Sequence, residues 1–174
     1  MRSKKGMAAQ HVLVYIITIL VFSFILVYGY NAIKGFKDKS EQISYIKFKT
    51  DLTSTIKRVS PDYGTVKEAE FFIGGEYQKV CFVKNYAVTD RNALADHIEN
   101  LGTADNNPII ADSIRSGVDK NVFLFAGESL QESFDIGKID IDTTGYLCID
   151  ISKGKAKIKF EGMGDHTIIS MWGD

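Results

Sequence analysis

One long apolar run near the N-terminus dominates the hydrophobic pattern of this chain. Residues 12 to 28 read VLVYIITILVFSFILVY, and thirteen of these seventeen residues are Leu, Ile, Val or Phe. Counted from His11 to Tyr30 the run has about 20 residues, and a helix of that length spans roughly 30 Å, the thickness of a bilayer's hydrocarbon core. Because the run is apolar on every side, it is typical of a helix surrounded by lipid. The pattern predicts one transmembrane helix.

A cleaved secretory signal and a buried core helix are the alternatives. The apolar part of a secretory signal usually has only about 7 to 15 residues and precedes small residues at the cut. Here the run is longer, and the bulky Tyr30 stands where a small residue is expected. A basic N-terminus with Arg2, Lys4 and Lys5 precedes the run, which is unusual for a core helix. The pattern therefore favours an anchor that stays in the membrane.

The polar and apolar positions after the run predict an amphipathic stem that continues the helix. No proline occurs between Asn31 and Ser60, and Pro61 then restricts the residue before it to non-helical geometry. Four apolar residues lie on one helical face by their spacing: Phe48, Leu52, Ile56 and Val59. We expect this face to pack on a globular head.

The first part of the head has signals for two strands and two short helices. Residues 66–73 and 77–84 are typical of strands, and Gly74-Gly75 between them predicts a hairpin. Thr89 or Asp90 can cap a helix that runs to about Leu101 and stops at Gly102. Residues 108–116 predict a second short helix, ended by Gly117.

The rest of the head alternates short apolar runs with turn residues. These runs are NVFLFAG, SFDIGKIDID, YLCIDI, KAKIKFEG and HTIISMW, and they predict strands joined by hairpin turns. Ile139 and Ile141 alternate with aspartates, so one face of that strand is expected to be buried. Strands, then helices, then more strands indicate an α+β fold with a mainly antiparallel sheet. The expected organisation is a basic leader (1–6), a transmembrane helix and stem (7–60) and a head domain (61–174).

Charge divides the chain into a basic and an acidic part. Residues 1–39 contain six basic and one acidic side chain, and residues 40–174 contain fifteen basic and twenty-one acidic side chains. An acidic head disfavours binding to phosphate backbones, so we expect no nucleic-acid partner. The basic flanks suit anionic lipid headgroups, and the lipid bilayer is the expected partner.

Cys81 and Cys148 are the two cysteines, and both lie in apolar runs. A disulfide between them is permitted if the head lies outside the cytoplasm. It would close a loop of about 67 residues and add roughly 4 kcal/mol in the chain-entropy model. Two buried free cysteines that pack as small apolar residues are the alternative.

No catalytic, cofactor or metal motif stands out. Residues 140–145 (DIDTTG) resemble the opening of a calcium loop, but Thr144 and Ile151 stand at its fifth and twelfth positions, so a turn explains the segment better. The histidines His11, His97 and His166 have no companions at metal-ligand spacing. Glu68 and Glu70 share a strand face, where carboxylates are usually solvated. We expect no enzyme, no cofactor and no metal, although residues that only the fold brings together could still act as a catalytic site.

The N-terminus supplies one family resemblance. It reads MRSKKG followed directly by MAAQHVLVYIITILV: a short basic leader that ends in Lys4-Lys5-Gly6, a few small or polar residues, and then the apolar run. This arrangement resembles the class III signal of type IV pilin-like proteins, which include pilins, pseudopilins, archaeal pilins and archaellins. It covers about the first 60 residues. His11 stands where members commonly have a glutamate at the fifth mature position.

The resemblance implies processing, orientation and assembly. A prepilin-type peptidase would cut on the cytoplasmic side between Gly6 and Met7 and leave the apolar run in place. The N-terminus would be cytoplasmic and the head extracytoplasmic, with a single membrane pass. The chain would then be a structural subunit or minor pilin of a surface filament or secretion pseudopilus, with self-assembly through the N-terminal helix. The alternative is a signal-anchored envelope protein that does not polymerise and whose head binds a partner or ligand.

Overall fold

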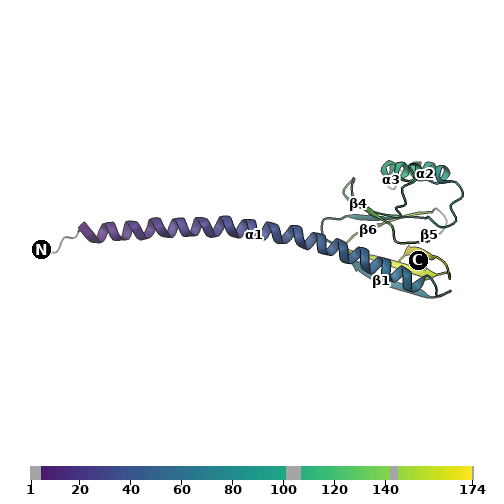
Figure 1. Cartoon of the computed structure of the whole chain (residues 1–174), viewed down its shortest axis with the longest axis horizontal. Coiled ribbons are helices and arrows are strands. Elements are labelled where there is room, and N and C mark those ends of the chain that lie inside the picture. The colour runs from purple at the N-terminus through teal and green to yellow at the C-terminus, as the bar shows by residue number, and fades with distance from the viewer. Residues whose placement is uncertain (1–4, 101–106, 142–144, 174) are drawn as a thin grey trace. The chain divides into compact units, whose positions relative to one another are not determined.

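The computed structural model describes residues 5–100, 107–141 and 145–173, and the side chains of these residues except 5–11 and 37–38. The chain divides into two units, residues 1–42 and residues 43–174. Helix α1 (Lys5–Val59) supplies the described part of the first unit and the first element of the second (Figure 1).

The second unit has the α+β character that the residue pattern predicts for residues 61–174, and it also includes the end of α1 from Ile43. It is called the head below. After α1, its described residues form two short helices and eight strands, in the order β1 (Val66–Phe72), β2 (Lys79–Val83), α2 (Arg91–Glu99), α3 (Pro108–Arg115), β3 (Val122–Ala126), β4 (Ser129–Phe134), β5 (Ile139–Ile141), β6 (Tyr146–Asp150), β7 (Lys155–Gly162) and β8 (Thr167–Met171).

The strands form two four-stranded sheets. One sheet, here called sheet A, has the order β1-β7-β8-β5, and the other, sheet B, has the order β4-β3-β2-β6. Neighbouring strands are antiparallel except β5 and β8, which are parallel. The expectation of mainly antiparallel pairing is confirmed.

The predicted hairpin at Gly74-Gly75 is wrong. β1 pairs with β7 in sheet A, whereas β2 pairs with β3 and β6 in sheet B. The segment between them crosses from one sheet to the other, and Gly74 adopts a φ of 116°, which favours glycine. Crossing lets Phe71 of sheet A and Val80 of sheet B bury their side chains in one core between the sheets.

The run SFDIGKIDID also divides between the two sheets. β4 ends at Phe134 in sheet B, and β5 begins at Ile139 in sheet A. The side chain of Asn121, only 1% exposed, holds the connection: its Oδ1 accepts from the Ile136 N–H at 3.0 Å, and its Nδ2 donates to the Gly137 carbonyl at 2.7 Å. The buried asparagine thus supplies hydrogen-bond partners to backbone groups in the segment between the two sheets.

The apolar face predicted between residues 48 and 59 is buried in the structure. Its four residues are 0–3% exposed and belong to the core between the sheets: Phe48, Leu52, Ile56 and Val59. The Phe48 ring meets the Phe71 ring of sheet A at 5.9 Å and the Phe134 ring of sheet B at 6.0 Å, both edge-on. Edge-to-face packing of this kind stabilises an aromatic cluster beyond its buried area. The last three turns of α1 are therefore part of the head's core.

Sheet B is covered on both faces, which explains why β2 and β3 are almost continuously apolar. Val80 and Phe82 face the core between the sheets, whereas Cys81 and Val83 belong to a second cluster with Ile98 and other residues of helices α2 and α3. Figure 1 shows these two helices side by side. Because successive strand residues point to opposite faces, a strand buried on both sides needs apolar residues throughout.

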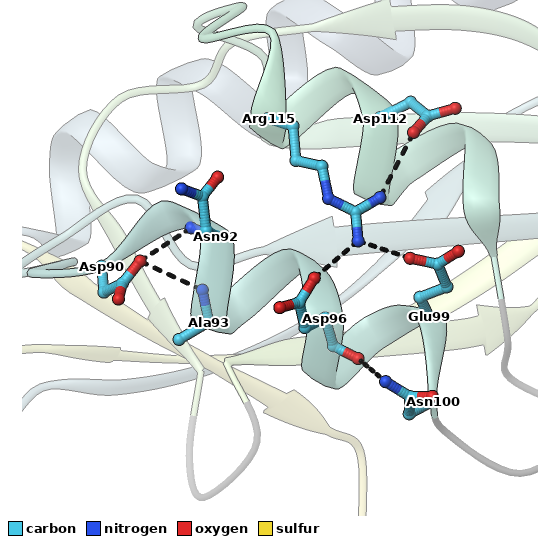
Figure 2. A network of polar contacts seen from close by, with 8 residues as sticks. All are labelled: Asp90, Asn92, Ala93, Asp96, Glu99, Asn100, Asp112 and Arg115. Carbon is cyan, nitrogen blue, oxygen red and sulfur yellow. Dashed lines mark hydrogen bonds and ion pairs between the residues drawn. The ribbon is translucent and has the colours of Figure 1, made fainter.

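The two predicted head helices are confirmed, with local caps. Asp90 Oδ1 accepts from the N–H groups of Asn92 and Ala93 at 2.9 and 3.1 Å, so Asp90 caps α2 (Figure 2). Asn107 caps α3, and Gly117 after its end has a φ of 72°. The predicted stop of the first helix at Leu101 and Gly102 lies outside the described residues.

Arg115 connects α3 to α2. Its guanidinium bonds Asp96 at 2.6 Å and also Glu99, both on α2, and Asp112 on its own helix at 3.3 Å (Figure 2). These carboxylates raise the pKa of Arg115 above its usual range, with Asp96 contributing most. The network is exposed, so we expect it to contribute little to stability.

Candidate functional site

The apolar part of helix α1 is the first candidate. Among the described residues, α1 is the one helix long and apolar enough to cross a membrane. From Val12 to Val27 its large apolar side chains are 51–68% exposed. A soluble surface rarely exposes a contiguous apolar area of this size. The finding is consistent with a single membrane pass.

The predicted processing site lies at the start of the same helix. Gly6 and Met7 follow its first residue, Lys5, and their side chains lie outside the described residues, as does Lys4 altogether. Cleavage between Gly6 and Met7 therefore stays a prediction.

Cys81 and Cys148 lie opposite each other on β2 and β6 and form a disulfide. The bonds from Ile151 N–H to the Gln78 carbonyl and from Lys84 N–H to the Gly145 carbonyl make the cysteines a non-hydrogen-bonded pair. Such pairs bring the Cα atoms closest, and here they are 4.0 Å apart. The disulfide lies beneath helices α2 and α3, and the Tyr146 hydroxyl is 2.8 Å from Sγ of Cys148.

The residues that resembled a calcium loop have other partners. Asp140 forms an ion pair with Lys84 at 2.9 Å and accepts from the Ile141 N–H at 2.7 Å, while residues 142–144 lie outside the described residues. Glu70 pairs with Lys155 at 2.6 Å, and this bond lowers the pKa of Glu70. Within the described residues, no group of three histidine, cysteine or acidic side chains could hold a metal ion.

His166 belongs to a polar cluster that sequence patterns did not reveal. Its Nδ1 lies 2.6 Å from Asp165, its ring stacks on Tyr86 at 3.8 Å, and the Tyr86 hydroxyl donates to Asp165 at 2.8 Å. The bonds from His166 and Tyr86 lower the pKa of Asp165, and the bond to Asp165 raises the pKa of Tyr86. The three side chains are hydrogen-bonded or stacked on one another. The cluster is therefore best explained as a structural contact that connects the turn after β2 to the turn before β8.

A small hollow lies where the end of β2, the start of α2 and the loop after α3 meet. It has a volume of about 100 Å³, with Val83, Leu94 and Ile114 among its apolar lining residues. Three cationic side chains also line it: Lys84, Arg91 and Lys120. Sequence reasoning missed this site because no local motif joins residues so far apart in the chain.

A scan against protein-family models and searches of curated proteins and of solved structures found no match to this chain.

Proposed function

We propose that this protein is a single-pass membrane-anchored subunit of the type IV pilin-like class, a structural subunit or minor pilin of a surface filament or secretion pseudopilus. The observation behind the proposal is helix α1 itself. Its N-terminal half exposes apolar side chains on all sides, and its last turns, from Phe48 to Val59, are buried in the head's core. One helix thus contains both the anchor and a core element of the head.

Lipid is the solvent that suits the exposed half of α1. Thirteen Leu, Ile, Val and Phe residues lie between Val12 and Tyr28, and each favours insertion by roughly 0.3 to 0.6 kcal/mol near the membrane centre. Their sum is about 4 to 8 kcal/mol in favour of insertion. Thr18 and Ser23 do not oppose it, because their hydroxyls donate to the carbonyls of Val14 and Ile19 within the helix.

The basic leader supports the pilin-like class over other anchors. Lys4-Lys5-Gly6, followed by five residues and then the apolar run, resembles the arrangement that a prepilin-type peptidase recognises in that class. The proposed topology has a cytoplasmic N-terminus and an extracytoplasmic head. The disulfide between Cys81 and Cys148 supports this placement, since disulfides persist in oxidising compartments.

Terminal mass analysis of the membrane-extracted protein tests the processing step. We expect a chain that begins at Met7 when a prepilin-type peptidase is co-expressed, and an uncut chain in the Gly6→Leu variant. Gly35→Leu is the matched control, because Gly35 lies in the same helix with no atom near its would-be Cβ. An intact Met1 terminus in the native chain, with the peptidase present, would count against the pilin-like assignment. Protease accessibility of the head from outside the cell tests its sidedness.

Cysteine cross-linking tests assembly. The native cysteines are both in the disulfide, so introduced cysteines are the only free thiols. Leu13 and Phe22 lie nine residues apart, on opposite sides of the helix by its period of 3.6. A polymer predicts a ladder of cross-linked species for the Leu13→Cys, Phe22→Cys double variant and no more than a dimer for either single variant. Monomer alone in all three would favour the non-polymerising anchored protein.

A further inference from the structure

The hollow between β2, α2 and the loop after α3 combines an apolar floor with a cationic rim. Val83 and Ile114 on the floor are 3% and 8% exposed, and Leu94 is half-buried. Water inside such a hollow has few polar partners on its floor, so an apolar group that replaces the water is favoured.

Three cationic side chains and one carboxylate, that of Asp119, line the rim. Lys84 is engaged with Asp140 at 2.9 Å. Arg91 lies 3.6 Å from Asp119, but the two side chains are 57% and 89% exposed, and exposed pairs of this kind are weak and easily exchanged. Lys120 has no ion-pair partner among the residues that the structure describes. Arg91 and Lys120 can therefore turn toward a negative charge at the mouth.

Size limits what the hollow accepts. A cavity of about 150 Å³ in a protein core is large enough for a benzene ring. A hollow of about 100 Å³ therefore admits a branched chain of about four carbons, and it is smaller than the pockets that enclose whole cofactors.

From this combination we infer that the hollow binds a small aliphatic carboxylate, with its branched chain on the Val83–Ile114 floor and its carboxylate between Arg91 and Lys120. Arginine and lysine form charge-assisted bonds to carboxylates, which are stronger than neutral hydrogen bonds. The ligand can be a free branched acid or the C-terminal residue of a peptide that ends in leucine or valine. This inference does not depend on the proposed filament function.

Methyl NMR of the full chain in detergent micelles tests the inference. Isovalerate is titrated at constant ionic strength, and the methyl signals of Leu94, Ile114 and Val118 at the hollow are followed. We expect saturable shifts with a Kd of about 1 mM. Arg91→Gln and Lys120→Gln should each weaken binding about tenfold, because each removes one charge-assisted bond. Arg58→Gln, an exposed arginine on α1, is the matched control and should leave the Kd unchanged.

Two further ligands test whether the negative charge is needed and which kind of molecule carries the carboxylate. Isovaleramide has the same shape without the charge, and it should bind at least tenfold more weakly than isovalerate. N-acetyl-glycyl-leucine represents a peptide C-terminus. If it binds more tightly than isovalerate, the ligand is a peptide C-terminus; if it does not, the ligand is a free acid. The inference is overturned if isovalerate shifts no methyl at the hollow, if isovaleramide binds equally well, or if both charge-removing variants bind like the native chain.

Discussion

Gly162 at the end of β7 is the position where the fold should tolerate a side chain least. A Cβ atom added there would lie 2.1 Å from the Val59 carbonyl oxygen and 2.3 Å from that of Asp62, where helix α1 ends. Both neighbours are backbone atoms, so no side-chain rotation can relieve the clash. The smallest substitution, Gly162→Ala, must therefore move β7 away from the end of the helix.

The size of the effect follows from the contacts involved. Carbon and carbonyl oxygen atoms normally approach to about 3.3 Å, so the added methyl requires a movement of about 1 Å. Forcing extra atoms into a packed site costs about 1 to 3 kcal/mol. The Gly162 N–H donates to the Thr65 carbonyl at 2.9 Å, and its carbonyl accepts from the Gly64 N–H at 2.8 Å. Losing these bonds adds about 0.5 to 1.5 kcal/mol each, so we expect about 2 to 6 kcal/mol of destabilisation.

Thermal unfolding of the full chain in detergent micelles measures this cost. The chain has one tryptophan, Trp172, which follows β8, and the Lys157 ammonium of β7 lies 5.4 Å from its ring centroid, so its fluorescence reports on sheet A. At about 2 to 4 °C per kcal/mol, Gly162→Ala should lower Tm by roughly 5 to 20 °C. Gly75→Ala is the matched control, since Gly75 has no atom within 4 Å of the added methyl and no positive φ, and it should shift Tm by less than about 2 °C. Equal Tm values for the two variants would refute the packing argument.

Three further predictions concern the head. Asn121→Ala leaves the Ile136 N–H buried without a partner, so it should destabilise the head by about 1 to 3 kcal/mol; an unchanged urea midpoint would contradict that role. The double variant Cys81→Ala, Cys148→Ala removes the bond that closes a loop with a sequence separation of 67, so its free energy of unfolding should fall by roughly 4 kcal/mol in the chain-entropy model. Native protein with the disulfide reduced should show the same loss in the same urea titration. The pKa of Asp165 is lowered from its ordinary 3.8, so the stability it contributes is present above that value and is lost as pH falls through the folded-state pKa. Asp165→Asn should accordingly lower Tm near pH 6 and flatten its fall below pH 4, and a Tm–pH curve that matches the native one would exclude this contribution.

The sequence by itself determined the elements whose signals are local. The apolar spacing from Phe48 to Val59 predicted one buried face, which the structure has. Thr89 or Asp90 was the predicted cap of α2, and the structure has Asp90; Gly117 was predicted to end α3, and that helix ends just before it. Hydrophobic period and capping act over a few residues, so they can be recognised without the fold. The long apolar helix near the N-terminus was also predictable, because its length and composition are local properties of the sequence.

The tertiary structure alone decided which strands pair and which side chains meet. β1 and β2 each have ordinary strand patterns, but their placement in different sheets depends on partners far along the chain, β7 and β6. The same holds for Gly162, whose requirement comes from the end of a distant helix, and for the hollow that brings Arg91 to Lys120. Such contacts form where two segments bury their apolar faces in one core. The free energy of that burial depends on both segments packed together, so neither segment's sequence determines it alone.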